Sequence, residues 1–165
     1  MNTGDGKGKT TAAFGIAFRA AGHGQQVAIV QFIKGSWDYG EVKAAERFSN
    51  MTLRRIGSGY TWKAKDPEEP RRLARDAWML CGELLRSDEY DLLVMDELNI
   101  AVAEGYVRPQ EVVDLLREKP ARLSVVLTGR DAAPELVAIA DTVTEMKNIK
   151  HAFEEGIPAQ RGIEF

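Results

Sequence analysis

The feature that most constrains this chain is a glycine-rich stretch near its start, where glycines at positions 4, 6 and 8 are followed by Lys9 and Thr10. Glycine lets the backbone turn its N–H groups toward one point without side chains in the way. The Ala-rich apolar segment that follows predicts a helix whose positive N-terminal end faces the same point. This arrangement is typical of a loop that binds phosphate, and a plain glycine-rich turn before a helix is the alternative.

Two positions of this loop have chemical roles in such a site. Lys9 neutralises phosphate charge, and the hydroxyl of Thr10 is placed to hold a magnesium ion. The match to the usual motif is imperfect, because Thr3 occupies the position of its first glycine. A buried strand normally precedes a phosphate loop, and only Met1 and Asn2 stand before Thr3. We therefore expect that strand to be missing from this chain; the alternative is a fold that does without it.

Size and composition limit the classes of protein to consider. With 165 residues, the chain predicts a single domain over residues 1–165. A net charge of −3 and a pI near 5.5 argue against general binding to nucleic acids or anionic membranes. The one cysteine, Cys81, excludes an internal disulfide, and its helical spacing among apolar residues predicts a core position. There is no membrane-length apolar run and no signal peptide, so a cytoplasmic protein is expected.

Apolar runs alternate with amphipathic segments along the chain. Short apolar runs bounded by turns predict buried strands, and apolar residues at helical spacing predict helices. The strands are expected at 27–33, 52–56, 91–97, 123–128 and 141–146, and the helices at 10–21, 41–49, 67–86, 98–104, 109–118 and 134–140. This alternation predicts an α/β protein with a P-loop NTPase-like, three-layer fold and a mainly parallel sheet.

The second informative stretch is the apolar run that ends in Asp96 and Glu97. An acid at the end of such a strand meets the magnesium ion of a phosphate loop, so Thr10, Asp96 and Glu97 are the candidate metal ligands. The alternative for Glu97 is a carboxylate at a helix N-terminus, where the helix dipole favours it. The strand at 123–128 brings Arg130 to the same edge, to meet phosphate or to form a surface salt bridge.

Two further segments carry candidate ligand-binding residues. A glycine-flanked loop at 57–63 holds Tyr60 and Trp62, which either cover a ligand or fill the core. The tail at 147–165 has no clear periodicity and is either a lid or a loosely packed end. His151 in this tail either lines a site or lies at the surface. Since neither histidine has partners at metal-ligand spacing, no zinc site is expected.

The chain resembles the P-loop corrinoid adenosyltransferases over almost its whole length and in the family's order. The phosphate-loop and strand-acid motifs are generic to many nucleotide-binding proteins. Three motifs are specific: Val-Gln-Phe-Ile-Lys-Gly at 30–35, Gly-Tyr-Thr-Trp at 59–62 and Ala-Gln-Arg-Gly-Ile-Glu at 159–164. The matching segments are 3–13, 19–24, 30–35, 59–62, 94–98, 127–130, 149–151 and 159–164.

This resemblance implies an activity and its requirements. The implied reaction moves the 5′-deoxyadenosyl group of ATP to the Co(I) centre of a corrinoid such as cob(I)alamin, releasing triphosphate and forming adenosylcobalamin. The family is also described as cytoplasmic, dependent on Mg²⁺ (with Mn²⁺ as a substitute) and homodimeric, and a flavoprotein reductase is the implied partner. ATP is expected in the loop in the reverse of its orientation in most P-loop enzymes.

The resemblance also implies roles for individual residues. It assigns Lys9, Tyr60 and Trp62 to catalysis, and Tyr60, Trp62, His151 and Phe153 to the corrinoid, with the tail at 147–165 as a lid over that site. Two departures from the family are visible: the strand expected before the loop is missing, and Ala152 stands where a proline is expected. The implied ATP-binding residues are Gly4, Asp5, Gly6, Lys7, Gly8, Lys9, Thr10, Thr11 and Arg130.

The chemistry of the residues agrees with this activity. Co(I) is a strong nucleophile and needs no general base, and no Ser/His/Asp or Cys/His constellation lies near the motifs. The protein has to orient C5′ of ATP and stabilise charge on the departing triphosphate. Two alternatives stay open: a small P-loop kinase or ATPase, which releases ADP, and a nucleotide-dependent corrinoid-binding protein without turnover.

Overall fold

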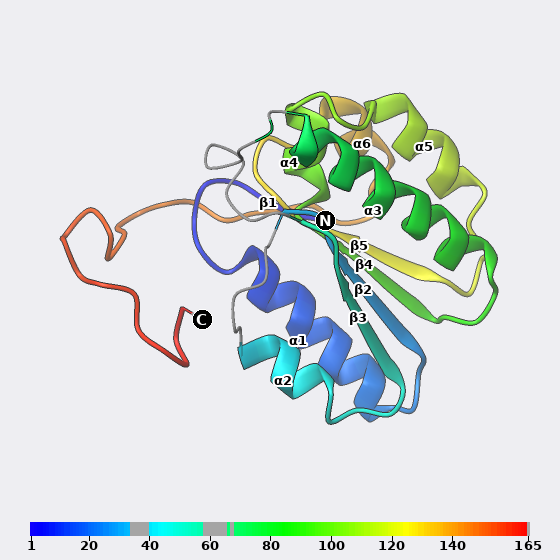
Figure 1. Ribbon diagram of the computed structural model, residues 1–165, viewed down its shortest axis with the longest axis horizontal. Helices are drawn as coiled ribbons and strands as arrows, with labels where there is room; N and C mark the ends of the chain where they lie inside the picture. Colours follow the sequence, from blue (N-terminus) through cyan, green and yellow to red (C-terminus); the bar gives the residue numbers. More distant parts are fainter. Residues whose placement is uncertain (34–39, 58–65, 67, 165) are drawn as a thin grey trace.

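The computed structural model describes residues 1–33, 40–57, 66 and 68–164, and Figure 1 shows a central sheet between two layers of helices. In chain order the elements are β1 (Asn2–Thr3), α1 (Lys9–Gly22), β2 (Val27–Gln31), α2 (Gly40–Ala45), β3 (Met51–Arg55), α3 (Glu69–Arg86), β4 (Leu92–Asp96), α4 (Leu98–Ala103), α5 (Pro109–Arg117), β5 (Ser124–Leu127), α6 (Pro134–Ile139) and β6 (Thr144–Glu145).

The main sheet has four parallel strands in the order β3-β2-β4-β5. Its register places Val27 of β2 opposite Met51 of β3 and Leu92 of β4. Strands β1 and β6 form a second parallel pair, and one bridge between Asn2 and Thr128 places β1 beside the end of β5. The predicted α/β class with a mainly parallel sheet is confirmed.

Both faces of the central strands β2 and β4 are buried, which explains why these two strands read as nearly continuous apolar runs. In β2, Val27 and Ile29 pack with α1 on one face, while Ala28 and Val30 pack with α3 on the other. Helices α1 and α2 cover the first face, and α3, α4, α5 and α6 cover the second (Figure 1). The central strands β2 and β4, which end at the site, are therefore packed against helices on both faces.

A short strand precedes the glycine-rich loop, where the sequence predicted a missing one. In β1 the carbonyl of Thr3 accepts the N–H of Met146 at 2.8 Å, and the carbonyl of Asn2 accepts the N–H of Gly129 at 3.2 Å. The strand is only two residues long, yet it has hydrogen-bonded neighbours on both sides. The loop thus begins from a two-residue strand that is paired on both sides.

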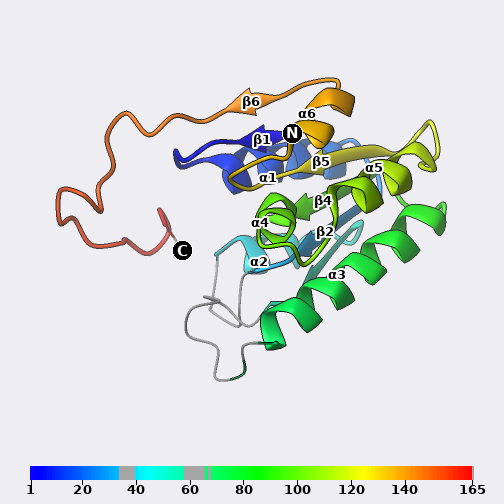
Figure 2. The ribbon, with the colours of Figure 1, turned by 90° about the horizontal axis from the view of Figure 1, so that it is seen from above.

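After β6 the chain leaves the layers and runs away from them before it curves back (Figure 2). At its end, Glu164 accepts a hydrogen bond from Lys7 of the glycine-rich loop at 3.3 Å. Large apolar side chains of this tail are exposed, namely those of Ile149, Phe153, Ile157 and Ile163. In the part of the chain that the structure describes, no helix is long and apolar enough to cross a membrane.

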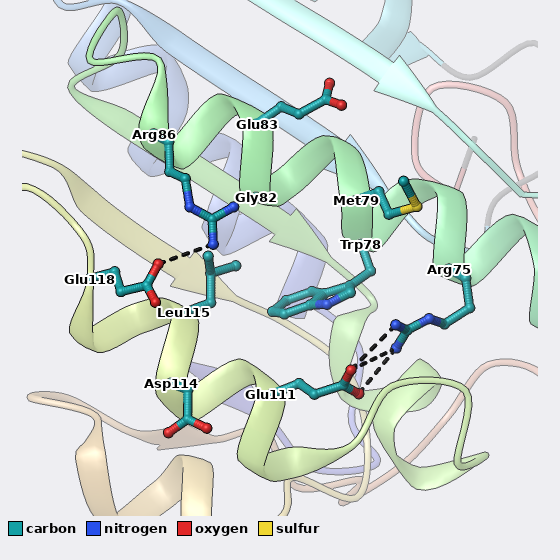
Figure 3. A pocket seen from close by; sticks show the side chains of 10 residues that line it. All are labelled: Arg75, Trp78, Met79, Gly82, Glu83, Arg86, Glu111, Asp114, Leu115 and Glu118. Carbon is teal, nitrogen blue, oxygen red and sulfur yellow. Dashed lines mark hydrogen bonds and ion pairs between the residues drawn. The ribbon is translucent and has the colours of Figure 1, made fainter.

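On the second face of the sheet, α3 packs against α5 along a shallow pocket (Figure 3). The Trp78 ring lies in this contact with 9% of its surface exposed. Two ion pairs join the helices beside it: Arg75 with Glu111 and Arg86 with Glu118, each at 3.0 Å. The pocket is thus a joint between two helices, closed at each end by a charge pair.

Candidate active site

The glycine-rich loop joins β1 to α1 and packs against the backbone that follows β6. Gly4 has φ of +90°, and a Cβ there would lie 2.5 Å from the carbonyl oxygen of Met146. At Gly6 a Cβ would lie 2.6 Å from the carbonyl oxygen of Lys147, and the Gly6 N–H donates to Met146 at 2.7 Å. Two of the glycines are therefore required by the fold as well as by any ligand.

The side chain of Lys9 curls back over this loop. Its Nζ donates to the carbonyl oxygens of Gly4 at 2.6 Å and Gly6 at 2.7 Å. Burial lowers the pKa of Lys9, and the nearby positive charge of Arg130 lowers it further. Gly8, with φ of +110°, forms the N-cap of α1, so the positive end of that helix points into the same region. Positive charge is thus concentrated at the loop.

Asp96, at the end of β4, lies beneath the loop with none of its surface exposed. Its Oδ1 accepts hydrogen bonds from the hydroxyls of Thr10 at 2.8 Å and Thr128 at 2.7 Å. Its Oδ2 accepts one from Nε2 of Gln31 at 2.9 Å. The ends of β2, β4 and β5 and the start of α1 are therefore tied to one carboxylate.

Glu97 follows Asp96 with a left-handed backbone, at φ of +65°. A non-glycine residue held in this region costs on the order of 1–3 kcal/mol, and such residues cluster at functional sites. Glu97 is the N-cap of α4, but its side chain makes no capping hydrogen bond. Its N–H donates to the hydroxyl of Thr128 at 2.8 Å, and its side chain borders the same hollow as Lys9. Glu97 therefore lies at the N-terminus of α4, where the helix dipole favours its carboxylate, and it also borders the hollow, so both roles given to it above stay open.

Most of the predicted site residues border one hollow at the carboxyl ends of β4 and β5, where open α/β sheets place ligands. Arg130 is there, 3.9 Å from the carboxylate of Asp5, and so is His151 of the tail. The lining residues are Asp5, Gly6, Lys7, Gly8, Lys9, Thr10, Thr11, Glu41, Glu97, Ile100, Thr128, Gly129, Arg130, His151, Ile163 and Glu164.

Among the described residues, Gly4, Asp96 and Phe153 were also predicted for the site and are not among those that line the hollow. Phe153 does not border the hollow, and 82% of its surface is exposed; its N–H donates to Nδ1 of His151 at 3.1 Å. Tyr60 and Trp62 lie outside the described residues. The prediction that these aromatic residues contact a ligand stays a prediction.

The oxygen atoms beside the loop fit a magnesium ion. Mg²⁺ prefers hard oxygen ligands and usually keeps waters, bound through one or two carboxylates and substrate phosphates. Thr10 and Asp96 supply such oxygens within 2.8 Å of each other, and Glu97 borders the same hollow. Among the described residues no cluster of three or more His, Cys, Asp or Glu side chains is suited to a metal. A metal here would therefore draw part of its coordination from nucleotide and water.

Sequence reasoning missed two contributors to this site. Gln31 stands in an apolar run, and a polar residue buried in a strand is itself a signal that it has a polar partner. Thr128 ends the strand predicted at 123–128, but the sequence did not predict that its hydroxyl joins Asp96 to the backbone of Glu97. Its partners are 31 and 32 residues away along the chain, so spacing alone does not pair them.

Comparison with known proteins gives matches along the whole chain. The profile of the family described as "ATP:corrinoid adenosyltransferase BtuR/CobO/CobP" matches residues 1–165. A corrinoid adenosyltransferase of Pseudomonas aeruginosa is 43% identical over all of this chain and 82% of its own length. One from Sinorhizobium sp is 44% identical over all of this chain and 78% of its own length. One from Escherichia coli K12 is 41% identical over 99% of this chain and 83% of its own length.

Proposed function

The chain belongs to the ATP:corrinoid adenosyltransferase BtuR/CobO/CobP family and is a corrinoid adenosyltransferase, and from this premise we propose how its residues divide the work. In this proposal the fold is of the P-loop type, and the loop at 3–11 holds the triphosphate of ATP. The 5′-deoxyadenosyl group moves to Co(I) of a corrinoid such as cob(I)alamin, and triphosphate leaves. ATP lies in the loop in the reverse of its usual orientation, so that C5′ faces the corrinoid.

One observation carries the proposal for the triphosphate: Lys9 and the N-terminus of α1 converge on the hollow that Thr10 and Glu97 border. In the reaction the bond between C5′ and the triphosphate oxygen breaks as the Co–C bond forms, and the electron pair of Co(I) supplies the new bond. Negative charge then grows on the leaving triphosphate. Preorganised positive groups at that point stabilise the transition state without having to reorient.

The metal ligands proposed are Thr10 and Asp96, with Glu97 at the rim of the hollow. A bound Mg²⁺ (or Mn²⁺) supplies further positive charge to the triphosphate oxygens. The hydroxyl of Thr10 donates a hydrogen bond to Asp96, which leaves the lone pairs of the Thr10 oxygen available to a cation. Asp96 keeps that hydroxyl oriented, and Arg130 adds a positive charge at the opening of the hollow.

For the corrinoid we propose Tyr60, Trp62 and His151, with the tail at 147–165 as a lid. His151 supports this part because it borders the hollow together with Ile163 and Glu164 of the same tail. Phe153 joins the corrinoid site in this proposal only if the tail closes further, since its ring is exposed. Aromatic side chains packed on one corrin face exclude the lower axial ligand of Co(II), which makes its reduction to Co(I) easier.

The remaining parts of the proposal concern the surroundings of the enzyme. It acts as a homodimer, draws electrons from a flavoprotein reductase, and works in the cytoplasm, where ATP is available. These parts rest on the family resemblance.

An anaerobic assay with ATP, Mg²⁺ and chemically reduced Co(I) corrinoid tests the core of the proposal. We expect the light-sensitive Co–C product and one triphosphate per turnover, and we expect Lys9→Ala to abolish ATP binding by calorimetry. Release of ADP instead of triphosphate would support a kinase or ATPase. Corrinoid binding without any Co–C product under strong reductant would support a binding protein without turnover.

A second assay tests the aromatic residues. Trp62→Ala is expected to slow adenosylation that starts from Co(II) much more than adenosylation that starts from Co(I). The reason is that the proposed role of Trp62 lies in the reduction step. Equal losses from both starting states would contradict that role.

A further inference from the structure

Gln31 is the last residue of β2 and is almost fully buried, with 2% of its surface exposed. The sheet register places it directly opposite Asp96, the last residue of β4. Since paired residues of neighbouring strands project to the same face, the two side chains meet, and Nε2 of Gln31 donates to Oδ2 of Asp96 at 2.9 Å. The amide thus contacts Asp96 across the strand pair, from the end of β2.

The other end of this amide is unsatisfied. Within the described part of the structure, Oε1 of Gln31 is buried and has no hydrogen-bond partner. A buried carbonyl oxygen without a partner costs free energy, and the rest of β2 consists of apolar residues, Val27 through Val30. Packing alone therefore favours an apolar side chain at this position. Among the described side-chain contacts of Gln31, the hydrogen bond to Asp96 is the one that a methionine at this position could not make.

That hydrogen bond fixes how the carboxylate of Asp96 is turned. With Oδ2 held by Gln31, the carboxylate cannot rotate, and Oδ1 stays aimed at the hydroxyls of Thr10 and Thr128. Thr10 then keeps its proton toward Asp96 and its lone pairs toward the hollow. Groups that orient metal ligands in this way typically change metal affinity about 10- to 100-fold when they are removed.

We propose that Gln31 is a positioning residue, which holds Asp96 so that Thr10 and Asp96 present their oxygens to the divalent cation of ATP. Gln31 acts through Asp96 and touches neither nucleotide nor corrinoid in this proposal. The inference rests on the proposed metal site at Thr10 and Asp96.

The test measures metal binding directly. Mn²⁺ is titrated into the full chain with a non-reactive ATP analogue, and free Mn²⁺ is followed by electron paramagnetic resonance. Gln31→Met keeps the length of the side chain and removes the donor, so we expect the Kd for Mn²⁺ to rise about tenfold. Affinity for the analogue in the presence of EDTA is expected to stay within about twofold, because the loop itself is unchanged. Gln31→Asn, which keeps an amide that is one methylene too short, is expected to weaken Mn²⁺ in the same way.

Asn50→Ala is the matched control. Like Gln31, Asn50 has a side-chain amide that donates hydrogen bonds. It donates to the carbonyls of Ala21 at 2.9 Å and Gln25 at 2.8 Å, at the end of α1 that is far from the site. This variant is expected to lower the melting temperature and to leave the Kd for Mn²⁺ unchanged. The Asn50 variant thus separates a loss of stability from a loss of metal positioning.

The outcomes separate this inference from the proposed function. If the natural chain binds Mn²⁺ tightly and both Gln31 variants bind it equally well, the inference is overturned and the metal site stands. An equal loss of Mn²⁺ affinity in Gln31→Met and Asn50→Ala also overturns the inference, because it reveals general destabilisation. A natural chain that binds no Mn²⁺ with the analogue overturns the proposed metal site and this inference with it.

Discussion

At the scale of single residues, the loop is shaped as much by its packing as by the anion it is suited to hold. Gly4 and Gly6 lie against the carbonyls of Met146 and Lys147, at distances that no Cβ tolerates. Gly8 has more room but a positive φ, which L side chains seldom adopt. A substitution at these positions therefore affects folding and nucleotide binding together.

Gly4→Ala is expected to lower both stability and ATP affinity. The added Cβ meets the backbone of Met146 and the side chain of Glu145, and that backbone cannot move without breaking the pairing of β1 with β6. We expect a loss on the order of 2 kcal/mol, which for a chain of this size lowers the melting temperature by roughly 4–8 °C. Calorimetry for ATP affinity and thermal melts measure the two effects.

Gly15→Ala is the matched control for this substitution. Gly15 lies within α1, and a Cβ there would have no atom within 4 Å. Alanine favours a helix by about 0.5–1 kcal/mol over glycine, so this variant is expected to melt slightly higher with unchanged ATP affinity. A Gly4→Ala variant that behaves like Gly15→Ala would contradict the packing described for the loop.

The sequence predicted the residues of the loop and the acids of β4, because each stands in a local motif. It did not predict the partners of Asp96 correctly, since Gln31 and Thr128 reach it only through the order of the strands. The sequence also did not predict that the side chain of Phe153 is exposed, because a tail without periodicity does not indicate which side chains face inward. Local motifs thus predicted which side chains belong to the site, whereas the order of the strands determines which of those side chains contact each other.

At the scale of helices and strands, the joint between α3 and α5 is where charge contributes to stability (Figure 3). Arg75 holds both oxygens of Glu111 at 3.0–3.3 Å, and the backbone N–H of Arg108 donates to the same carboxylate at 3.0 Å. These hydrogen bonds lower the pKa of Glu111 to about 2, and the bond from Arg75 has the largest effect. The carboxylate is therefore a stronger acid in the folded chain than in the unfolded one.

The free energy of unfolding is expected to fall in acid as Glu111 becomes protonated. A pKa that is lower in the folded state contributes stability above the unfolded value of 4.5, and this contribution is lost as the pH falls from there toward about 2. Glu111→Gln removes the titrating group, so its free energy of unfolding should depend less on pH over this window. Urea unfolding at a series of acidic pH values measures the difference.

Glu118→Gln is the control for Glu111. Its partner Arg86 lies at 3.0 Å, but both side chains are more than half exposed. Exposed pairs of this kind contribute about 0–1 kcal/mol, so this variant is expected to keep the pH dependence of the natural chain. Identical pH profiles for Glu111→Gln and the natural chain would show that Glu111 is not the group responsible.

Apart from β1, the order and type of the elements followed from the sequence, whereas the residues at which the elements begin and end did not. The helix predicted at 41–49 ends at Ala45, after which the N–H groups of Arg47 and Phe48 bond to carbonyls three residues back and tighten the chain into turns. The strand predicted at 141–146 has only Thr144 and Glu145 paired. Apolar periodicity marks the middle of an element, whereas its ends depend on where a partner stops.

At the scale of the whole molecule, the tail at 147–164 is attached to the site more than to the layers. Among its described links to the site, Glu164 forms an ion pair with Lys7 of the loop, and His151 and Ile163 line the hollow. Several of its large apolar side chains are exposed. Such a segment suits the proposed lid better than a structural support.

Removing residues 149–165 tests this reading. The strand pairs and both cores remain, so we expect the melting temperature to change by only a few degrees. Corrinoid affinity is expected to fall roughly tenfold, or by about 1.4 kcal/mol, because His151 and Ile163 no longer border the site. Binding titrations with corrinoid and with ATP measure both affinities, and unchanged corrinoid affinity would contradict the lid.

The pairing of β1 with β6 has a consequence for the order in which the protein matures. The loop at 3–11 takes its shape only when the N–H of Gly6 bonds to Met146 and the N–H of Met146 bonds to Thr3, contacts about 140 residues apart in sequence. Contacts of such long separation form late, because closing so large a loop has to be offset by structure already in place. During synthesis the glycine-rich loop therefore leaves the ribosome well before the residues near 146 to which it hydrogen-bonds. ATP binding thus reports that the chain has been made and folded through residue 147.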